Sequence, residues 1–271
     1  MRTALCLSGQ MRTYKKCFPS LKKYILDPFK PDIFIHTWDE IGGCTIEETK
    51  NVEKIDEKDI KKFYNPKKIV IEKFYDQYYA KKNDIATPEV VLKYAPRFKP
   101  AIPLFYKIYK CNQLKREYEQ KNQFIYDMVI RLRPDIMIYD WIPDRVLENL
   151  DVLWVPWKNE RGQWLVKDTF VISNSEIIDK YSQVWEHLKR YWEQPLCGEK
   201  YPLDKLNERW YPKLLVSERV LTYHCLNNDI NYEYFYMPFR LIRARGFGIK
   251  KIVDDMIWNA RYVYMKKIGW G

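Results

Sequence analysis

Short apolar runs alternate with longer helix-like stretches along the amino-terminal half of the chain. The first run, residues 3–8 (TALCLS), is followed by a helical stretch at 14–26 and then by a second apolar run at 32–38 (DIFIHTW). Two strands that flank a helix pair in parallel through a right-handed crossover, because a tight hairpin cannot join parallel strands. This order predicts an α/β fold, with a mixed, mostly parallel sheet that helices flank on both faces.

The same alternation continues toward the carboxyl terminus. Strands are predicted at 68–72, 126–131, 151–155, 168–173 and 232–236, and helices at 104–120, 175–192, 217–225 and 250–268. Residues 47–62 form a charge-rich helix or loop, and the proline-punctuated stretch at 76–100 is expected to be a mobile excursion. We therefore predict a single domain over residues 1–245, followed by a basic amphipathic helix at 246–271.

Composition excludes several classes of nucleotide and metal site. Glycine accounts for 9 of 271 residues, and neither the GxGxxG fingerprint nor the GxxxxGK[ST] phosphate loop occurs. The chain has 3 histidines and no HExxH motif, which argues against a histidine-based metal site. Lys and Arg outnumber Asp and Glu by 47 to 36, for a net charge of +11, so we expect an anionic partner.

The cysteines and the hydropathy pattern bear on the compartment. The 6 cysteines are scattered and form no CxxC pair, which is typical of a protein in a reducing cytoplasm. No apolar stretch of about 18 residues occurs, and the amino-terminal apolar run is too short for a signal peptide. These features predict a cytoplasmic protein without a transmembrane helix.

Polar residues follow the first predicted strand at its carboxyl end, where open α/β sheets bind their ligands. They are Ser8, Gly9, Gln10, Arg12 and Thr13. Gly9 allows the backbone to approach a ligand, and the guanidinium of Arg12 can form a fork onto a phosphate. The alternative, an ordinary strand-to-helix turn with a surface arginine, is equally compatible with the sequence.

The end of the second predicted strand carries His36 and Trp38. These two side chains can hydrogen-bond to a nucleotide base or stack on it. The alternative is a buried tryptophan beside a histidine whose hydrogen bonds are satisfied within the protein.

The strand at 126–131 ends in Arg131-Leu132-Arg133-Pro134-Asp135. Two arginines two positions apart on a strand point to the same face, and at the end of an apolar strand they need an anionic partner. That partner is either a ligand phosphate or a protein carboxylate. Asp135 could hold a divalent cation beside the phosphate, whereas a purely structural Arg–Asp cluster is the alternative.

Two carboxylates are candidates for a general base. Asp168 stands at the start of a predicted strand, after a loop rich in charged residues. Glu218 stands at the start of a predicted helix and is the second candidate. Either residue could instead be an ordinary loop or helix-start residue.

Five segments together resemble a glycosyltransferase-like family of bacterial surface-polysaccharide loci and large DNA viruses. They are LCLSGQMRT at 5–13, PDIFIHTWD at 31–39, FYKIYKCN at 105–112, YDMVIRLRPD at 126–135 and DTFVISNSE at 168–176. The resemblance extends from residue 4 to about residue 225. It implies a GT-A-type, Rossmann-like fold with a nucleotide-binding half at about 1–140 and an acceptor-binding half at about 141–245.

The resemblance also implies an activity and its ligands. The expected reaction moves a hexosyl or pentosyl group from a nucleoside-diphosphate sugar, with UDP- and GDP-sugars favoured, to a hydroxyl of a glycan acceptor. The product would be a surface polysaccharide or a glycoprotein glycan. Lys110, in the third of the five segments, joins the candidate nucleotide-sugar ligands. Sugar faces pack well on aromatic rings, and the candidates for the acceptor side are Trp154, Trp157, Trp164, Trp210 and Tyr211.

Members of such families hold Mn²⁺ or Mg²⁺ on the diphosphate with an Asp-x-Asp motif. Arg133-Pro134-Asp135 occupies that position here and lacks the first aspartate. Either Asp135 alone holds the metal, or Arg131 and Arg133 neutralise the diphosphate without one.

Two other functions remain open at this point. The missing aspartate favours a catalytically inactive module that binds a nucleotide sugar or a glycan. The positive charge suggests a nucleic-acid-binding protein, but the lysines are spread out and form no recognition motif, so no nucleic-acid partner is expected. The basic helix at 246–271 could add a peripheral contact with an anionic membrane.

Overall fold

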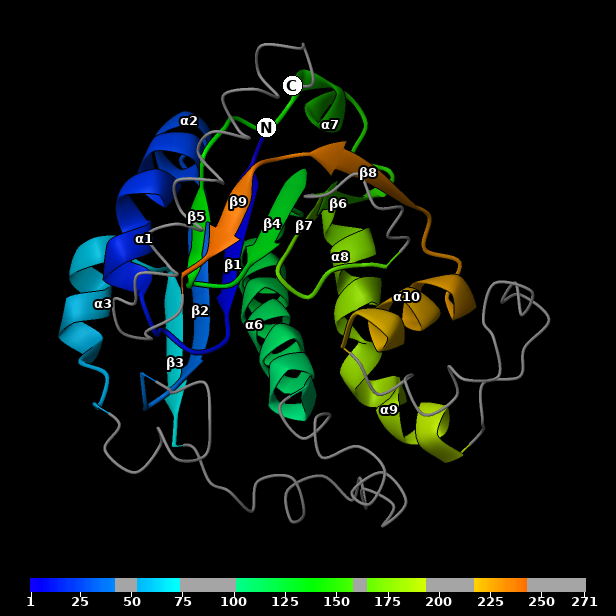
Figure 1. The fold of residues 1–271 in the computed structure, drawn as a ribbon, viewed down its shortest axis with the longest axis horizontal. Coiled ribbons are helices and arrows are strands. Elements are labelled where there is room, and N and C mark those ends of the chain that lie inside the picture. Colours follow the sequence, from blue (N-terminus) through cyan, green and yellow to red (C-terminus); the bar gives the residue numbers. More distant parts are fainter. Residues whose placement is uncertain (42–52, 74–100, 158–164, 194–216, 243–271) are drawn as a thin grey trace, which may run out of the picture.

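The computed structural model describes residues 1–41, 53–73, 101–157, 165–193 and 217–242 (Figure 1). Within these residues the centre of the fold is a seven-stranded sheet in the order β3-β2-β1-β4-β7-β6-β8. Its strands are β1 (Thr3–Ser8), β2 (Asp32–Trp38), β3 (Lys68–Glu72), β4 (Met128–Leu132), β6 (Leu153–Trp157), β7 (Phe170–Ser173) and β8 (Tyr232–Tyr236). The predicted α/β class, with a mixed and mostly parallel sheet flanked by helices, is confirmed.

The strands from β3 to β4 are parallel, and β7 alone runs against its neighbours in this sheet. From β1 the strand order extends outward through β2 to β3, while β4 lies on the other side of β1. The order therefore reverses between β1 and β4, which is the type of position where open α/β sheets form a crevice at the carboxyl ends of the strands.

Two hydrophobic clusters cover the two faces of the sheet. The first is formed by the sheet with α6 (Ala101–Asn122), α8 (Ser175–Ser182), α9 (Val184–Glu193) and α10 (Ser217–Asn227). The second involves α1 (Tyr14–Leu21), the π-helical turn η1 (Lys22–Leu26), α3 (Glu57–Tyr64) and α7 (Asp144–Glu148); α2 (Asp27–Phe29) follows η1. The inner strands are buried on both faces, which explains their continuous apolar runs.

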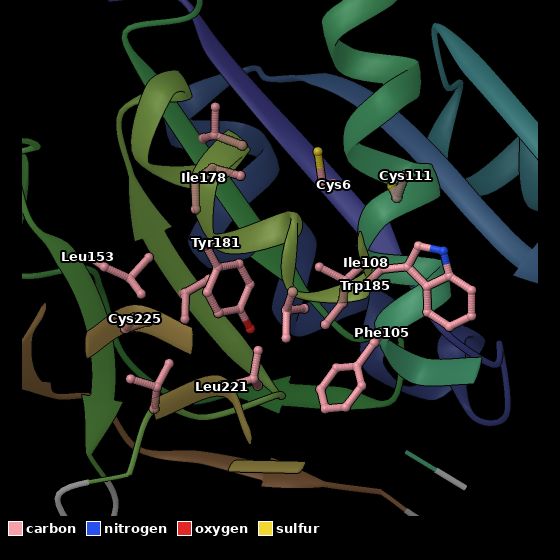
Figure 2. Close-up of a cluster of buried hydrophobic side chains, with 14 of the residues drawn as sticks. Cys6, Phe105, Ile108, Cys111, Leu153, Ile178, Tyr181, Trp185, Leu221 and Cys225 are labelled. Carbon is pink, nitrogen blue, oxygen red and sulfur yellow. The ribbon is translucent and has the colours of Figure 1, made fainter. Parts of the chain in front are cut away.

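Figure 2 shows part of the first cluster, in which Tyr181 of α8 lies among Leu153, Leu221 and Cys225. Cys6 of β1 and Cys111 of α6 belong to the same cluster, and both are buried free thiols. Burial raises the pKa of Cys111 well above its ordinary value, so this thiol stays protonated at neutral pH.

A second, two-stranded sheet pairs β5 (Ile136–Ile138) with β9 (Phe239–Leu241) in antiparallel register. The strand β5 contacts α1, so this sheet packs on the same side of the fold as α1 (Figure 1). The sequence pattern did not predict either strand, because three residues are too few to show a period.

Most predicted elements have counterparts in the structure, but several bounds differ. The strands predicted at 126–131 and 151–155 begin two residues later, at Met128 and Leu153. The helix predicted at 175–192 consists of α8 and α9, which are interrupted at Gln183. Asp168 precedes β7 by two residues instead of opening it. The helix α3 begins at Glu57 within the stretch predicted at 47–62, of which residues 47–52 lie outside the described residues. The excursion predicted at 76–100 and the basic helix predicted at 246–271 lie outside the described residues.

Candidate functional site

The candidate site lies where β1 and β4 end, at the reversal of strand order. Gly9 follows β1 with φ of +122° and donates its N–H to the carbonyl oxygen of His36 at 3.4 Å. A Cβ atom at Gly9 would meet nothing within 4 Å, so the backbone angle alone requires glycine here. Gln10, next in the turn, is half-buried. The turn thus leaves open space beside the end of β1.

Asp135 is the centre of the site. Its carboxylate is 1% exposed and lies between Arg12, from the turn after β1, and Arg133, which follows β4. Arg133 donates Nε to Oδ1 and Nη2 to Oδ2, both at 2.9 Å, and Arg12 donates Nη1 to Oδ2 at 3.0 Å. Two loops that are distant in sequence therefore meet at one carboxylate.

The charge state of Asp135 follows from these contacts. Burial alone would raise the pKa of the carboxyl group, but the attraction and hydrogen bonds of Arg133, and then of Arg12, outweigh that effect. The result is a pKa below the ordinary aspartate value, so the carboxylate is ionised at neutral pH. The structure therefore contains an ionised Arg–Asp–Arg cluster at the strand ends.

Arg131 lies deeper than its neighbours, at 1% exposure. Its Nε donates to the Ser8 hydroxyl at 3.0 Å, and its Nη1 donates to the backbone carbonyl oxygen of Asp168. Burial lowers the pKa of this guanidinium from its ordinary value, and the positive charge of Arg133 lowers it further. Arg131 thus ties the ends of β1 and β4 to the segment before β7.

The two base candidates differ in their relation to this cluster. Asp168 is 8% exposed, and its Oδ2 lies 3.6 Å from Nη1 of Arg133, so it faces the arginine cluster. Glu218 is half-buried in the first turn of α10, where it accepts a hydrogen bond from the Ser217 hydroxyl at 3.1 Å. The Thr222 hydroxyl on α10 accepts the N–H of Val166 at 2.8 Å, which attaches this helix to the segment just before Asp168.

A main-chain contact that the sequence did not predict joins the site to the segment after β9. Ile242, directly after β9, donates its N–H to the Asp135 carbonyl oxygen at 2.8 Å. Its own carbonyl oxygen accepts the Thr13 hydroxyl at 2.5 Å. Thr13, predicted as a ligand contact, is therefore bonded to the protein backbone. No side-chain signal at Ile242 could have revealed this contact, because only its peptide groups take part.

His36 and Trp38 lie under the amino-terminal half of α6 and not at an open surface. They are 3% and 2% exposed; Tyr106 stacks on Trp38 with ring centroids 6.1 Å apart and meets His36 edge to face at 6.0 Å. Lys107, which is fully buried, places Nζ 3.5 Å from the centre of the Trp38 ring. Both rings are therefore buried, as the alternative interpretation of the sequence expects.

Lys107 and Glu72 were not predicted as a pair. Lys107 Nζ donates to Glu72 Oε2 and to the Thr37 carbonyl oxygen, both at 2.9 Å, and the Tyr106 hydroxyl donates to Glu72 Oε1 at 3.1 Å. The sequence feature that could have indicated this pair is a lysine among the apolar positions of the predicted helix at 104–120. Lys110, one turn further along α6, is partly buried and donates a hydrogen bond to Gln113 Oε1 at 3.0 Å. This hydrogen bond does not involve the Asp135 cluster.

Of the five aromatic candidates for the acceptor side, two lie in the described residues. Trp154 is 3% exposed, donates Nε1 to the Asn149 carbonyl oxygen at 2.5 Å and packs against Phe235, so it is a core residue. Trp157 ends β6. Trp164, Trp210 and Tyr211 lie outside the described residues.

The described residues do not fit a divalent cation at Asp135. Both carboxylate oxygens already accept guanidinium hydrogen bonds, and no group of three or more His, Cys, Asp or Glu side chains that could hold a metal occurs in the described ranges. Mg²⁺ and Mn²⁺ favour several oxygen ligands.

No family model and no curated protein matches this chain. Among the helices of the described residues, none is long and apolar enough to cross a membrane.

Proposed function

We propose that this protein is a glycosyltransferase of GT-A type, which transfers a sugar from a nucleoside-diphosphate sugar to a hydroxyl group of a glycan acceptor. One observation carries the proposal: Arg12 and Arg133 converge on Asp135, and Asp168 faces Arg133, at the strand-order reversal, where α/β sheets bind nucleotides. The expected donors are UDP- or GDP-sugars.

The chemistry requires two kinds of assistance, and the site contains a side chain for each. As the bond between the anomeric carbon and the diphosphate oxygen breaks, negative charge grows on the leaving phosphate, and preorganised cations stabilise it. We assign this role to Arg12 and Arg133, which Asp135 already orients. Guanidinium groups suit it because their planar forks match phosphate oxygens.

The acceptor hydroxyl must lose its proton as its oxygen attacks the anomeric carbon. In a single displacement with inversion, a carboxylate takes that proton, and we assign this role to Asp168. Its Oδ2 lies 3.6 Å from the Arg133 guanidinium, so proton acceptor and leaving-group cation are neighbours. Glu218 is the second candidate, because α10 is attached to the segment that leads to Asp168.

Arg131 and Ser8 have a supporting role in this scheme. Arg131 is buried and holds the Asp168 main chain, so we assign it to positioning and not to direct contact with the diphosphate. A fixed main chain keeps the Asp168 carboxylate in one orientation, which is what general-base catalysis needs.

The test is nucleotide release from a panel of UDP-, GDP- and dTDP-sugars, with simple glycosides as acceptors. Release above that of a heat-inactivated sample, with one nucleotide preferred, supports the proposal. Nucleotide-sugar binding without release supports instead the second candidate, an inactive binding module, which the substitution of Arg133 for the first aspartate of Asp-x-Asp favours. Absence of both release and binding contradicts the proposal.

A further inference from the structure

Asp135 is an internal carboxylate with most of its hydrogen-bonding capacity in use. An ionised carboxylate has about four lone-pair positions. Guanidinium N–H groups take three of them, one on Oδ1 and two on Oδ2. A metal ion would therefore have to displace at least one charge-assisted hydrogen bond, and this class of hydrogen bond is the strongest in proteins.

Exposure shows which groups an incoming ligand meets. The Asp135 side chain is 1% exposed, whereas those of Arg12 and Arg133 are 14% and 13% exposed. Solvent therefore reaches the side chains of Arg12 and Arg133, and that of Asp168 at 11% exposure, but hardly reaches Asp135. A ligand approaching from solvent thus meets two arginines and one carboxylate before it reaches Asp135.

The sum of charges favours an anion over a cation. Arg12, Arg131 and Arg133 bring three positive charges, and Asp135 and Asp168 bring two negative ones, so the cluster has one positive charge in excess. A divalent cation would increase this excess, whereas a diphosphate would remove it. In a mostly buried cluster such charges are only weakly screened.

We propose that Asp135 is the internal counter-ion that orients Arg12 and Arg133, and that these two arginines bind the diphosphate of the nucleotide directly, without a divalent cation. The inference deepens the proposed function and rests on it. The ligand class is a nucleoside diphosphate, recognised through its phosphate oxygens by two guanidinium forks that are held in place before binding.

The experiment measures binding of UDP and GDP to the full chain by calorimetry, once in EDTA and once with Mn²⁺. The expected dissociation constants in the two buffers agree within about threefold for the preferred nucleotide, because binding needs no bridging metal. In EDTA, Arg12→Met and Arg133→Met each weaken binding by about tenfold or more, since each removes a charge-assisted contact.

Asp135→Asn separates the two possible roles of this residue. If Asp135 is a counter-ion, the amide variant still binds the nucleotide in EDTA, because the arginines and not a metal ion make the contacts with the diphosphate. If Asp135 is a metal ligand, the variant loses Mn²⁺-dependent binding. The matched control is Asp179→Asn on α8, a carboxylate that also pairs with two basic side chains, Lys115 at 3.0 Å and Arg116 at 3.4 Å, but belongs to the helical layer.

The outcomes separate a failure of this inference from a failure of the proposed function. Binding that requires Mn²⁺ in the unmodified protein overturns this inference and leaves the proposed function standing. Absence of binding by any nucleotide, with or without Mn²⁺, overturns both. If Asp135→Asn does not fold, as judged by circular dichroism, the comparison of EDTA with Mn²⁺ in the unmodified protein decides by itself.

Discussion

The guanidinium of Arg131 and the hydroxyl of Ser8 join two neighbouring parallel strands, with Nε donating to Oγ at 3.0 Å where β1 ends. The same guanidinium donates Nη1 to the Asp168 carbonyl oxygen, so one side chain connects three segments. A buried arginine is costly unless its N–H groups find acceptors. Here the acceptors are a hydroxyl and a peptide group, and the site beside them depends on this arginine.

Replacing Arg131 by Met should lower the free energy of unfolding by about 1–3 kcal/mol, because the Asp168 carbonyl loses its buried donor. Urea denaturation followed by circular dichroism measures this change. The free energy of unfolding of Arg131→Lys should lie between those of the unmodified protein and Arg131→Met, since one ammonium group cannot make both hydrogen bonds of the guanidinium. Unchanged stability of the Met variant would show that Arg131 does not tie these segments together.

Replacing Asp168 by Asn should reduce turnover by roughly 10²- to 10⁴-fold, because an amide cannot take the acceptor proton. Nucleotide affinity should stay nearly the same, since the arginines that meet the diphosphate are retained. Nucleotide release measures the first quantity and calorimetry the second. Turnover close to that of the unmodified protein would remove Asp168 from the role of base, and the same assay on Glu218→Gln would then test the second candidate.

Lys107 and Glu72 should show energetic coupling in a double-mutant cycle. Lys107→Met alone should destabilise the fold by about 1–3 kcal/mol, because the Thr37 carbonyl and the Glu72 carboxylate lose a buried donor. The cost stays moderate since Glu72 is 23% exposed and water can replace the lost contact. Glu72→Gln in the Lys107→Met background should cost less than Glu72→Gln alone. Strictly additive effects in urea denaturation would contradict the coupling.

Stability should fall as pH drops from about 6.5 to about 4. Burial lowers the pKa of His224 to about 4, and its ring nitrogens bond to the Tyr191 hydroxyl at 2.6 Å and the Lys180 carbonyl oxygen at 2.7 Å. Because the folded pKa lies below the unfolded one, the unfolded chain binds more protons in this window, and acid favours unfolding. The loss at pH 4 should reach about 3 kcal/mol at most.

The pH effect can be assigned to His224 by comparing how steeply the free energy of unfolding changes with pH in the unmodified protein and in variants. His224→Gln should be less stable at pH 7 yet lose less stability between pH 6.5 and pH 4, as measured by urea denaturation at each pH. His187 is a matched control: burial also lowers its pKa, but its ring is only partly buried, so His187→Gln should change the slope less. Equal slopes in the unmodified protein and His224→Gln would contradict the assignment.

The sequence predicted the sheet well because its inner strands are continuous apolar runs, which local patterns reveal. It did not predict β5 and β9, whose existence depends on a pairing between residues distant in the chain. The same limit applies to the site. Arg12, Arg133 and Asp135 were found from their position after strands, but their mutual hydrogen bonds depend on how two loops meet.

Burial was the least predictable property of individual side chains. Trp38 and His36 follow the pattern of ligand-binding residues at a strand end, yet α6 covers them. Lys107 carries a charge but is fully buried, because a carboxylate, a carbonyl oxygen and the Trp38 ring surround its ammonium group. Tertiary contacts compensate the cost of burying this charge, and the local hydropathy pattern does not reveal such contacts.

Hydrogen exchange at the Ile242 amide can report on local opening beside the site. Its amide proton is bonded to the Asp135 carbonyl oxygen, so the proton exchanges with solvent when the segment after β9 separates from the loop after β4. The exchange rate of this single amide therefore measures how often these two segments separate. A ligand that bridges Arg12 and Arg133 would slow that exchange without touching Ile242 itself.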